Sequence, residues 1–377
     1  MRRIFFSIIF IFSAVQLFAQ GKKEHTYAVV VNASAVNQYF EPSPVVMISA
    51  ENNDELKVLD ELENSFNKRP DRKLLLSFLK GLNNNNRDAG SKHRSKLYLH
   101  LANLLARLRL YPLVMKCYFK TSQPADDIYR KGYFIRQNPA GSDSVKIIND
   151  SLTAAGLLSI NGRDSLLLKT DTGAYNHNGR EIVSRPITDT GITNPFEDGK
   201  TAVKYALLVH IQQPKSGKPK IFIKLNKVGH TFVTLIKYNS DSTYVARTFG
   251  FYPDKESFLS ATPLFPSADP LFKNDEKHDW DEVVGKFISK RRFQKILLLV
   301  KQYNSRPYNL NNNNCTDFGL DAATIGGINI LDTYGKWPLG RGNNPATAGM
   351  SVLKGKVVNT DADEGDLFIY NDLINDK

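Results

Sequence analysis

Alternating apolar and polar side chains between residues 203 and 251 constrain the fold more than any other feature of the chain. From Val203 to Ile211 every odd position is apolar, which is the period of two expected for a β-strand. The alternation returns at 221–225, after a turn rich in Pro, Gly and Lys, and two further apolar segments cover 230–238 and 242–251. Together these segments predict an antiparallel sheet.

Helical spacing of apolar residues dominates on both sides of this region. Leucine and phenylalanine stripes at 56–66, 74–82 and 97–108 predict a small helical region. After the strands, the pattern predicts a helix from about Lys286 to Tyr303 and another from Cys315 to Ile325, which Gly326 and Gly327 end. The fold class predicted is therefore α+β, an antiparallel sheet packed on helices and preceded by a helical N-terminal domain.

The first twenty residues predict the compartment. Arg2 and Arg3 precede an apolar run at 4–12, and Ala19 stands near a cleavage point. This pattern is typical of a cleaved signal peptide, and the apolar run is short for a membrane span. We expect a secreted or periplasmic protein. Since no second long apolar stretch follows, we expect no transmembrane helix after the signal.

A chain of 377 residues is long for one small core and favours more than one domain. We predict a signal peptide at 1–20, a mostly helical domain at 21–120 and a polar linker or β-rich insertion at 121–199. The sheet and its helices would occupy 200–360. The acidic tail at 361–377 is expected to fray.

A formal net charge of +12 would draw the protein to anionic partners such as lipid head groups or wall polymers. A role in solubility alone is the alternative. Zinc-finger and aromatic RNA-binding patterns are missing from the sequence, so we expect no nucleic-acid partner. Repeated Cys pairs and a paired-His helix motif are also missing, so we expect no metal site and no cofactor.

The two cysteines have different surroundings. Cys117 lies within an apolar run and is expected to be a packing residue. Cys315 follows four asparagines, at 311–314, and would occupy the first turn of a helix. The helix dipole favours a thiolate there, and free N–H groups at the same end can hold an oxyanion. Cys315 is therefore the candidate nucleophile.

A cysteine nucleophile needs a base, and every histidine precedes Cys315. His210 is expected to face solvent from its strand, and His278 lies in a charged loop. His230 begins a strand directly after Gly229, whose small size leaves room for a substrate. We therefore pair Cys315 with His230. For a third group that orients the imidazole, Thr248 and Tyr252 are candidates, and neither is preferred.

Two short motifs resemble a known family. Arg306-Pro307-Tyr308 followed by Asn314-Cys315-Thr316 is similar to the nucleophile segment of NlpC/P60-type cell-wall hydrolases, which have Asp and Ser beside the cysteine. Gly229-His230-Thr231-Phe232-Val233 resembles the histidine strand of the circularly permuted members, in which histidine precedes cysteine. The resemblance covers about residues 200–345 and implies a papain-like module. It also implies that Tyr308 and Asn314 line the substrate site.

The residues and the resemblance together predict an exported cysteine hydrolase. Cys315 would form an acyl-enzyme with His230 as base, and the family implies a peptide bond in peptidoglycan, or another anionic envelope component, as the target. One alternative is a lipid-acting thiol acyltransferase or deacylase of the same fold. The other is a non-catalytic surface-binding protein with a degenerate papain-like core.

Overall fold

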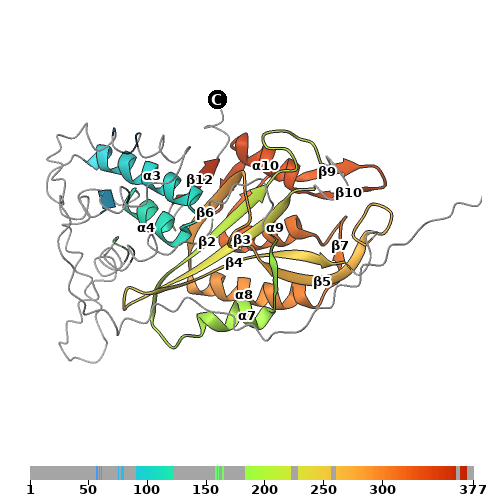
Figure 1. The fold of residues 1–377 in the computed structure, drawn as a ribbon, viewed down its shortest axis with the longest axis horizontal. Coiled ribbons are helices and arrows are strands. Elements are labelled where there is room, and N and C mark those ends of the chain that lie inside the picture. Colours follow the sequence, from blue (N-terminus) through green and yellow to red (C-terminus); the bar gives the residue numbers. More distant parts are fainter. Residues whose placement is uncertain are drawn as a thin grey trace, which may run out of the picture. The chain divides into compact units, whose positions relative to one another are not determined.

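The computed structural model describes residues 57, 59, 61, 75, 78, 79, 91–121, 158, 160, 164, 183–221, 228–255, 260–361 and 366–371. The predicted signal peptide, most of the first two predicted helices and nearly all of the predicted strand at 221–225 lie outside them. Mixed α and β structure with an antiparallel sheet is confirmed (Figure 1).

The elements follow one another in a fixed order along the described residues. The helices are α3 (Ser91–Arg107), α4 (Tyr111–Thr121), α7 (Asp189–Thr193), the 3₁₀ turn η1 (Asn194–Phe196), α8 (Lys290–Asn304), α9 (Cys315–Gly326) and α10 (Pro345–Leu353). The strands are β1 (Arg185–Ile187), β2 (Ala202–Gln212), β3 (His230–Asn239), β4 (Tyr244–Asp254), β5 (Ser267–Asn274), β6 (Glu282–Ile288), β7 (Tyr308–Asn309), β8 (Ile328–Ile330), β9 (Tyr334–Trp337), β10 (Gly340–Asn343), β11 (Val357–Asn359) and β12 (Phe368–Asn371).

One sheet organises the described residues. Its strands lie in the order β1-β5-β4-β3-β2-β6-β12, and β7 pairs with β5 (Figure 1). The predicted strands β2, β3 and β4 are confirmed at its centre, with Gln212 opposite His230 and Phe232 opposite Gly250. This register places the start of β3 beside the last residues of β4, at one end of these two central strands.

The strands β5 and β6 are not among the elements that the sequence predicts, and the predicted helix begins at about Lys286. Lys286 instead lies in β6, and α8 begins at Lys290 behind the cap residue Ser289, whose hydroxyl accepts from the Arg292 N–H. Since β6 is buried almost throughout, its residues do not alternate, and the period of two is lost.

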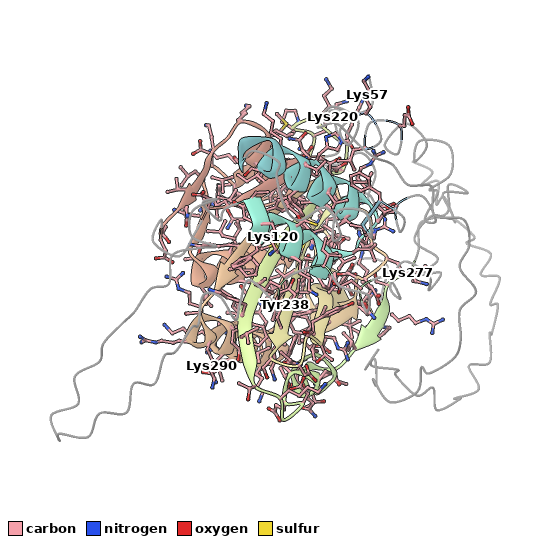
Figure 2. All side chains as sticks on the ribbon, turned by 90° about the vertical axis from the view of Figure 1, so that its left-hand side faces the viewer. Lys57, Lys120, Lys220, Tyr238, Lys277 and Lys290 are labelled. Carbon is pink, nitrogen blue, oxygen red and sulfur yellow. The ribbon has the colours of Figure 1, made fainter. Side chains whose placement is uncertain are left out.

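Both faces of the sheet are covered. Along β2, Leu207 and Val209 enter a core shared with α8 and α9, whereas Ala206 and Leu208 enter a second core shared with α3 and α4. The Tyr238 hydroxyl of β3 reaches into this second core and donates to the Pro112 carbonyl of α4 at 2.7 Å; Figure 2 labels Tyr238. The sheet therefore forms the middle layer between two sets of helices.

The prediction that His210 faces solvent was wrong. Its side chain is fully buried, stacked on the Phe232 ring at 4.7 Å and against Tyr111 of α4 at 4.5 Å. Its Nε2 atom lies 2.8 Å from the Thr234 hydroxyl. Burial, followed by the charge of Arg109, lowers the pKa of His210 well below its usual value. His210 is therefore a neutral packing residue under α4.

Described parts of the segment 121–199 join the core. Asp164 is buried and accepts from the Lys116 ammonium of α4 at 3.0 Å through each carboxylate oxygen. A buried pair of this kind needs both partners, because removing one leaves an uncompensated charge. The domain boundaries drawn at 120 and 199 stay predictions.

The acidic tail does not fray along its whole length. Phe368–Asn371 forms β12, which pairs antiparallel with β6 from Phe368 opposite Gly285 to Asn371 opposite Glu282. Phe368 is fully buried in the core with α4. The apolar residues of this short strand outweigh the surrounding acids, which were the basis of the prediction.

Candidate active site

Cys315 is the first residue of α9, as the sequence predicts. Asn314 caps the helix, and its side-chain oxygen accepts from the Thr316 N–H at 2.7 Å and the Asp317 N–H at 3.2 Å. The Asp317 carboxylate accepts in turn from the Asn314 N–H at 2.9 Å. This reciprocal capping box fixes the start of the helix and therefore the position of the sulfur.

Both ends of the Asn314 amide are engaged within the protein. Its Nδ2 atom donates to the Leu310 carbonyl and to the Asn343 carbonyl, each at 2.9 Å. These bonds tie the helix start to the preceding loop and to β10. The structure thus places Asn314 as a structural cap, and its predicted contact with a substrate stays a prediction.

Replacing Asn314 with alanine should lower the free energy of unfolding by about 2 kcal/mol. The variant loses the cap, and it leaves two carbonyls without a protein donor. Thermal or urea unfolding followed by circular dichroism measures the change. Asn312→Ala provides the control, because Asn312 is exposed and lies in the same asparagine run. Equal stabilities of the two variants would contradict the capping role.

His230 begins β3, and Gly229 sets its entry into the sheet. Gly229 has a φ of 75°, a conformation that costs other residues energy. A Cβ atom added there would also overlap the Gln212 carbonyl and Pro214. The glycine is therefore required by the backbone, in addition to any room it leaves for a substrate.

Close packing of α9 on β3 brings the nucleophile to its base. A Cβ atom at Gly319 of α9 would overlap the Thr231 side chain. The hydroxyls of Thr231 and Thr316 lie 3.2 Å apart, directly beside the two candidate residues. Cys315 and His230 lie close enough for each to shift the pKa of the other.

The third member of the site is Asp275, which the sequence did not reveal. His230 Nε2 lies 3.1 Å from Asp275 Oδ2, and the carboxylate is fully buried. Since Nε2 faces Asp275, the other ring nitrogen, Nδ1, is left for the sulfur of Cys315. Asp275 follows β5 directly, in the charged loop to which the sequence assigns His278.

Both candidates for the orienting group contact Asp275 instead. The Tyr252 hydroxyl donates to Asp275 Oδ1 at 2.8 Å, and its ring lies 4.2 Å from the His230 ring. The backbone carbonyl of Thr248 accepts from the Asp275 N–H at 3.0 Å. Ser184 supplies a further side-chain hydrogen bond. Thr248 and Tyr252 therefore position the carboxylate that orients the imidazole.

Electrostatics at the site favour an ion pair. Burial by itself lowers the pKa of His230, but the charge and hydrogen bond of Asp275 outweigh it and raise this pKa to about 9. Burial raises the pKa of Cys315, and the hydrogen bond and charge of His230 reverse that effect and leave it below its usual value. Near neutral pH the pair thus tends toward thiolate and imidazolium.

Gly250 of β4 leaves the space in which His230 and Asp275 meet. A Cβ atom added to this residue would overlap both His230 Nε2 and Asp275 Oδ2. In the antiparallel register Gly250 lies opposite Phe232, two residues after His230. A side chain here would force the imidazole and the carboxylate apart.

Tyr308 lies at the sulfur, where the resemblance placed it. It is 5 % exposed. It lines the same small cavity as Cys315. Burial, followed by the charge of Cys315, raises the pKa of Tyr308 well above its usual value, so the hydroxyl stays protonated. A hydroxyl in this position can donate to an oxygen held near the sulfur.

A second histidine lies next to the first. The His278 ring is 5.0 Å from the His230 ring, and its Nδ1 atom lies 2.8 Å from the Asp279 carbonyl. Burial and the neighbouring charge of His230 lower the pKa of His278. The charged loop in which the sequence placed His278 therefore folds against His230 and Phe232.

No protein-family model, curated protein or solved structure matches this chain. In the described part of the chain, no group of three or more His, Cys, Asp or Glu side chains could hold a metal ion. Across the same residues, no helix is long and apolar enough to cross a bilayer.

Proposed function

We propose that this protein is a thiol-dependent hydrolase that forms an acyl-enzyme at Cys315. The observation that carries the proposal is the buried pair of His230 and Asp275, together with a Cys315 thiol close enough for His230 to lower its pKa. A nucleophile, a base and an orienting carboxylate in that order are the arrangement that acyl transfer requires. Its position at a helix N-terminus adds N–H donors for a developing oxyanion.

The reaction begins with attack of the Cys315 thiolate on a carbonyl carbon. The carbonyl oxygen becomes an oxyanion, which the Cys315 N–H and the Tyr308 hydroxyl can hold. The His230 imidazolium gives its proton to the leaving amine as the C–N bond breaks, and a thioester remains. His230 then takes a proton from water, water attacks the thioester, and the carboxylic acid leaves with the thiolate restored.

The substrate we propose is an amide bond in peptidoglycan, acted on by an exported enzyme. The resemblance to NlpC/P60 hydrolases, which have a papain-like fold, supports an amide bond of peptidoglycan as the substrate. The signal-like leader supports export. The net charge of +12 suits an anionic envelope.

One observation favours the lipid-acting alternative. The described residues around Cys315 include Ile221, Val228, Leu310 and Trp337, which is an apolar lining suited to an acyl chain. Cys315 and His230 lie close enough to shift each other's pKa. This counts against a degenerate, non-catalytic core, because that hypothesis expects the two residues to lie apart.

Alkylation kinetics test the ion pair directly. Below the usual thiol pKa, iodoacetamide should modify Cys315 faster than an ordinary thiol, because the lowered pKa of Cys315 leaves more of it as thiolate. The rate should rise again above pH 9, as His230 loses its proton near its raised pKa of about 9. Hydrolysis should instead decline through that pH, because neutral imidazole cannot protonate the leaving amine.

Cys117 provides an internal control in the same experiment. It is fully buried in α4, and burial raises its thiol pKa. Peptide mass spectrometry after timed alkylation should find label at Cys315 and little at Cys117. Equal labelling of the two cysteines, or a Cys315 profile that follows an ordinary thiol, would refute the ion pair.

A further inference from the structure

A small cavity of about 30 Å³ adjoins the sulfur of Cys315. Its described lining consists of Ile221, Val228, Gly229, Tyr308, Leu310, Asn314, Cys315, Trp337, Asn343, Asn344 and Pro345. The volume is close to that of one water molecule in the liquid, about 30 Å³. A space of this size can take the terminal methyl or ethyl group of a short acyl chain.

The three asparagine side chains of this lining make hydrogen bonds within the protein. Asn343 donates to the Asp317 carboxylate at 2.8 Å and accepts from the Thr333 hydroxyl at 2.7 Å. Asn344 caps α10 and accepts from the Thr347 N–H at 3.0 Å. With Asn314 capping α9, all three amides of the lining hold the fold together rather than facing a ligand.

Charge is also scarce in the lining. Among its described members only Cys315 and Tyr308 are ionisable, and burial keeps Tyr308 protonated. A carboxylate entering the cavity would lose its hydration and meet no cation from these residues. An apolar group would instead contact Leu310, Trp337 and Pro345, and its removal from water would be favourable.

We propose that this cavity is the subsite for the acyl group and that it selects a short, uncharged, apolar chain. The inference rests on the proposed function, because the acyl chain of a thioester at Cys315 must lie beside the sulfur. It narrows the substrate to bonds whose carbonyl side carries a small apolar substituent.

Two matched esters test the selectivity. 4-Nitrophenyl butyrate and 4-nitrophenyl hemisuccinate have acyl chains of equal length and differ by a methyl against a carboxylate. In each, the thiolate attacks the ester carbonyl, 4-nitrophenolate leaves and a thioester forms at Cys315. The burst of 4-nitrophenolate gives the acylation rate, intact mass confirms the adduct, and each rate is divided by that of free cysteine. We expect butyrate to acylate at least about tenfold faster.

A charge introduced into the cavity should change this preference. Leu310→Lys places a cation in the lining and should raise the ratio of hemisuccinate to butyrate rates at least about tenfold. Leu298→Lys is the matched control, since Leu298 is 57 % exposed on α8 and outside the cavity. It adds the same charge to the protein and should leave the ratio unchanged. Unfolding curves confirm that both variants are folded.

The outcomes separate the subsite from the activity. Equal normalised rates for the two esters, or a ratio that Leu310→Lys leaves unchanged, would overturn the subsite and leave the thiol chemistry standing. A protein that neither ester acylates at Cys315 would overturn the proposed function and the subsite with it.

Discussion

Replacing Cys315 with alanine should abolish thioester formation and reduce hydrolysis by a factor on the order of 10⁴ or more. The sulfur is the attacking atom of the proposed reaction, and among the described residues it is the thiol that affects the pKa of His230. The cavity and the helix dipole survive in the variant, so substrate binding should persist. The expected signature is therefore a loss of turnover with little loss of affinity.

The assay compares wild-type protein, Cys315→Ala and Cys117→Ala. Soluble fragments released from purified peptidoglycan are identified by mass spectrometry, and phospholipid vesicles serve as the second substrate. Cys117→Ala should lose stability, because Cys117 packs in the core beneath the sheet, yet keep its turnover. Full turnover by Cys315→Ala would end the hypothesis, and turnover confined to the vesicles would select the lipid-acting alternative.

Asp275→Asn should lower kcat/KM by about 10² to 10⁴. The carboxylate accepts from His230 Nε2, and its charge is the main cause of the raised His230 pKa. An amide in its place removes that charge, so the imidazolium loses its proton at lower pH. The alkaline limb of the pH–rate profile should move down from about pH 9, and NMR titration of the His230 ring should show the same shift.

Asp269→Asn is the control for this change, because Asp269 is an exposed residue of β5, the same strand that leads to Asp275. A second variant, Gly250→Ala, tests the geometry without changing charge, because its methyl group would separate His230 from Asp275. It should cause a loss of similar size. A normal rate and pH profile in Asp275→Asn would remove the carboxylate from the mechanism.

The sequence could single out Cys315 and His230 as candidates because each belongs to a local pattern. The polar run before Cys315 ends at a capped helix, and His230 opens a strand of clear alternation. Cap residues and strand periods are read over a few neighbouring positions, so one sequence is enough to find them. Cys315 can then be paired with His230 because few histidines of the chain lie in a suitable segment.

Asp275 and the second face of the sheet could not be found in this way. Asp275 is buried within a charged run because Tyr252 and Thr248, more than twenty positions earlier, satisfy it. His210 is buried because α4, from a distant part of the chain, covers its face. Such positions depend on tertiary contacts, which leave no period or composition signal in the segment itself.

The tight approach of α9 to β3 has a consequence for the chain before it is folded. Thr231 and Thr316 are separated by 85 positions, so nothing local holds the sulfur near the imidazole. Until that long loop closes, the cysteine is an ordinary thiol with no neighbouring base. The lowered pKa of the Cys315 thiol therefore depends on long-range contacts that only the folded chain supplies.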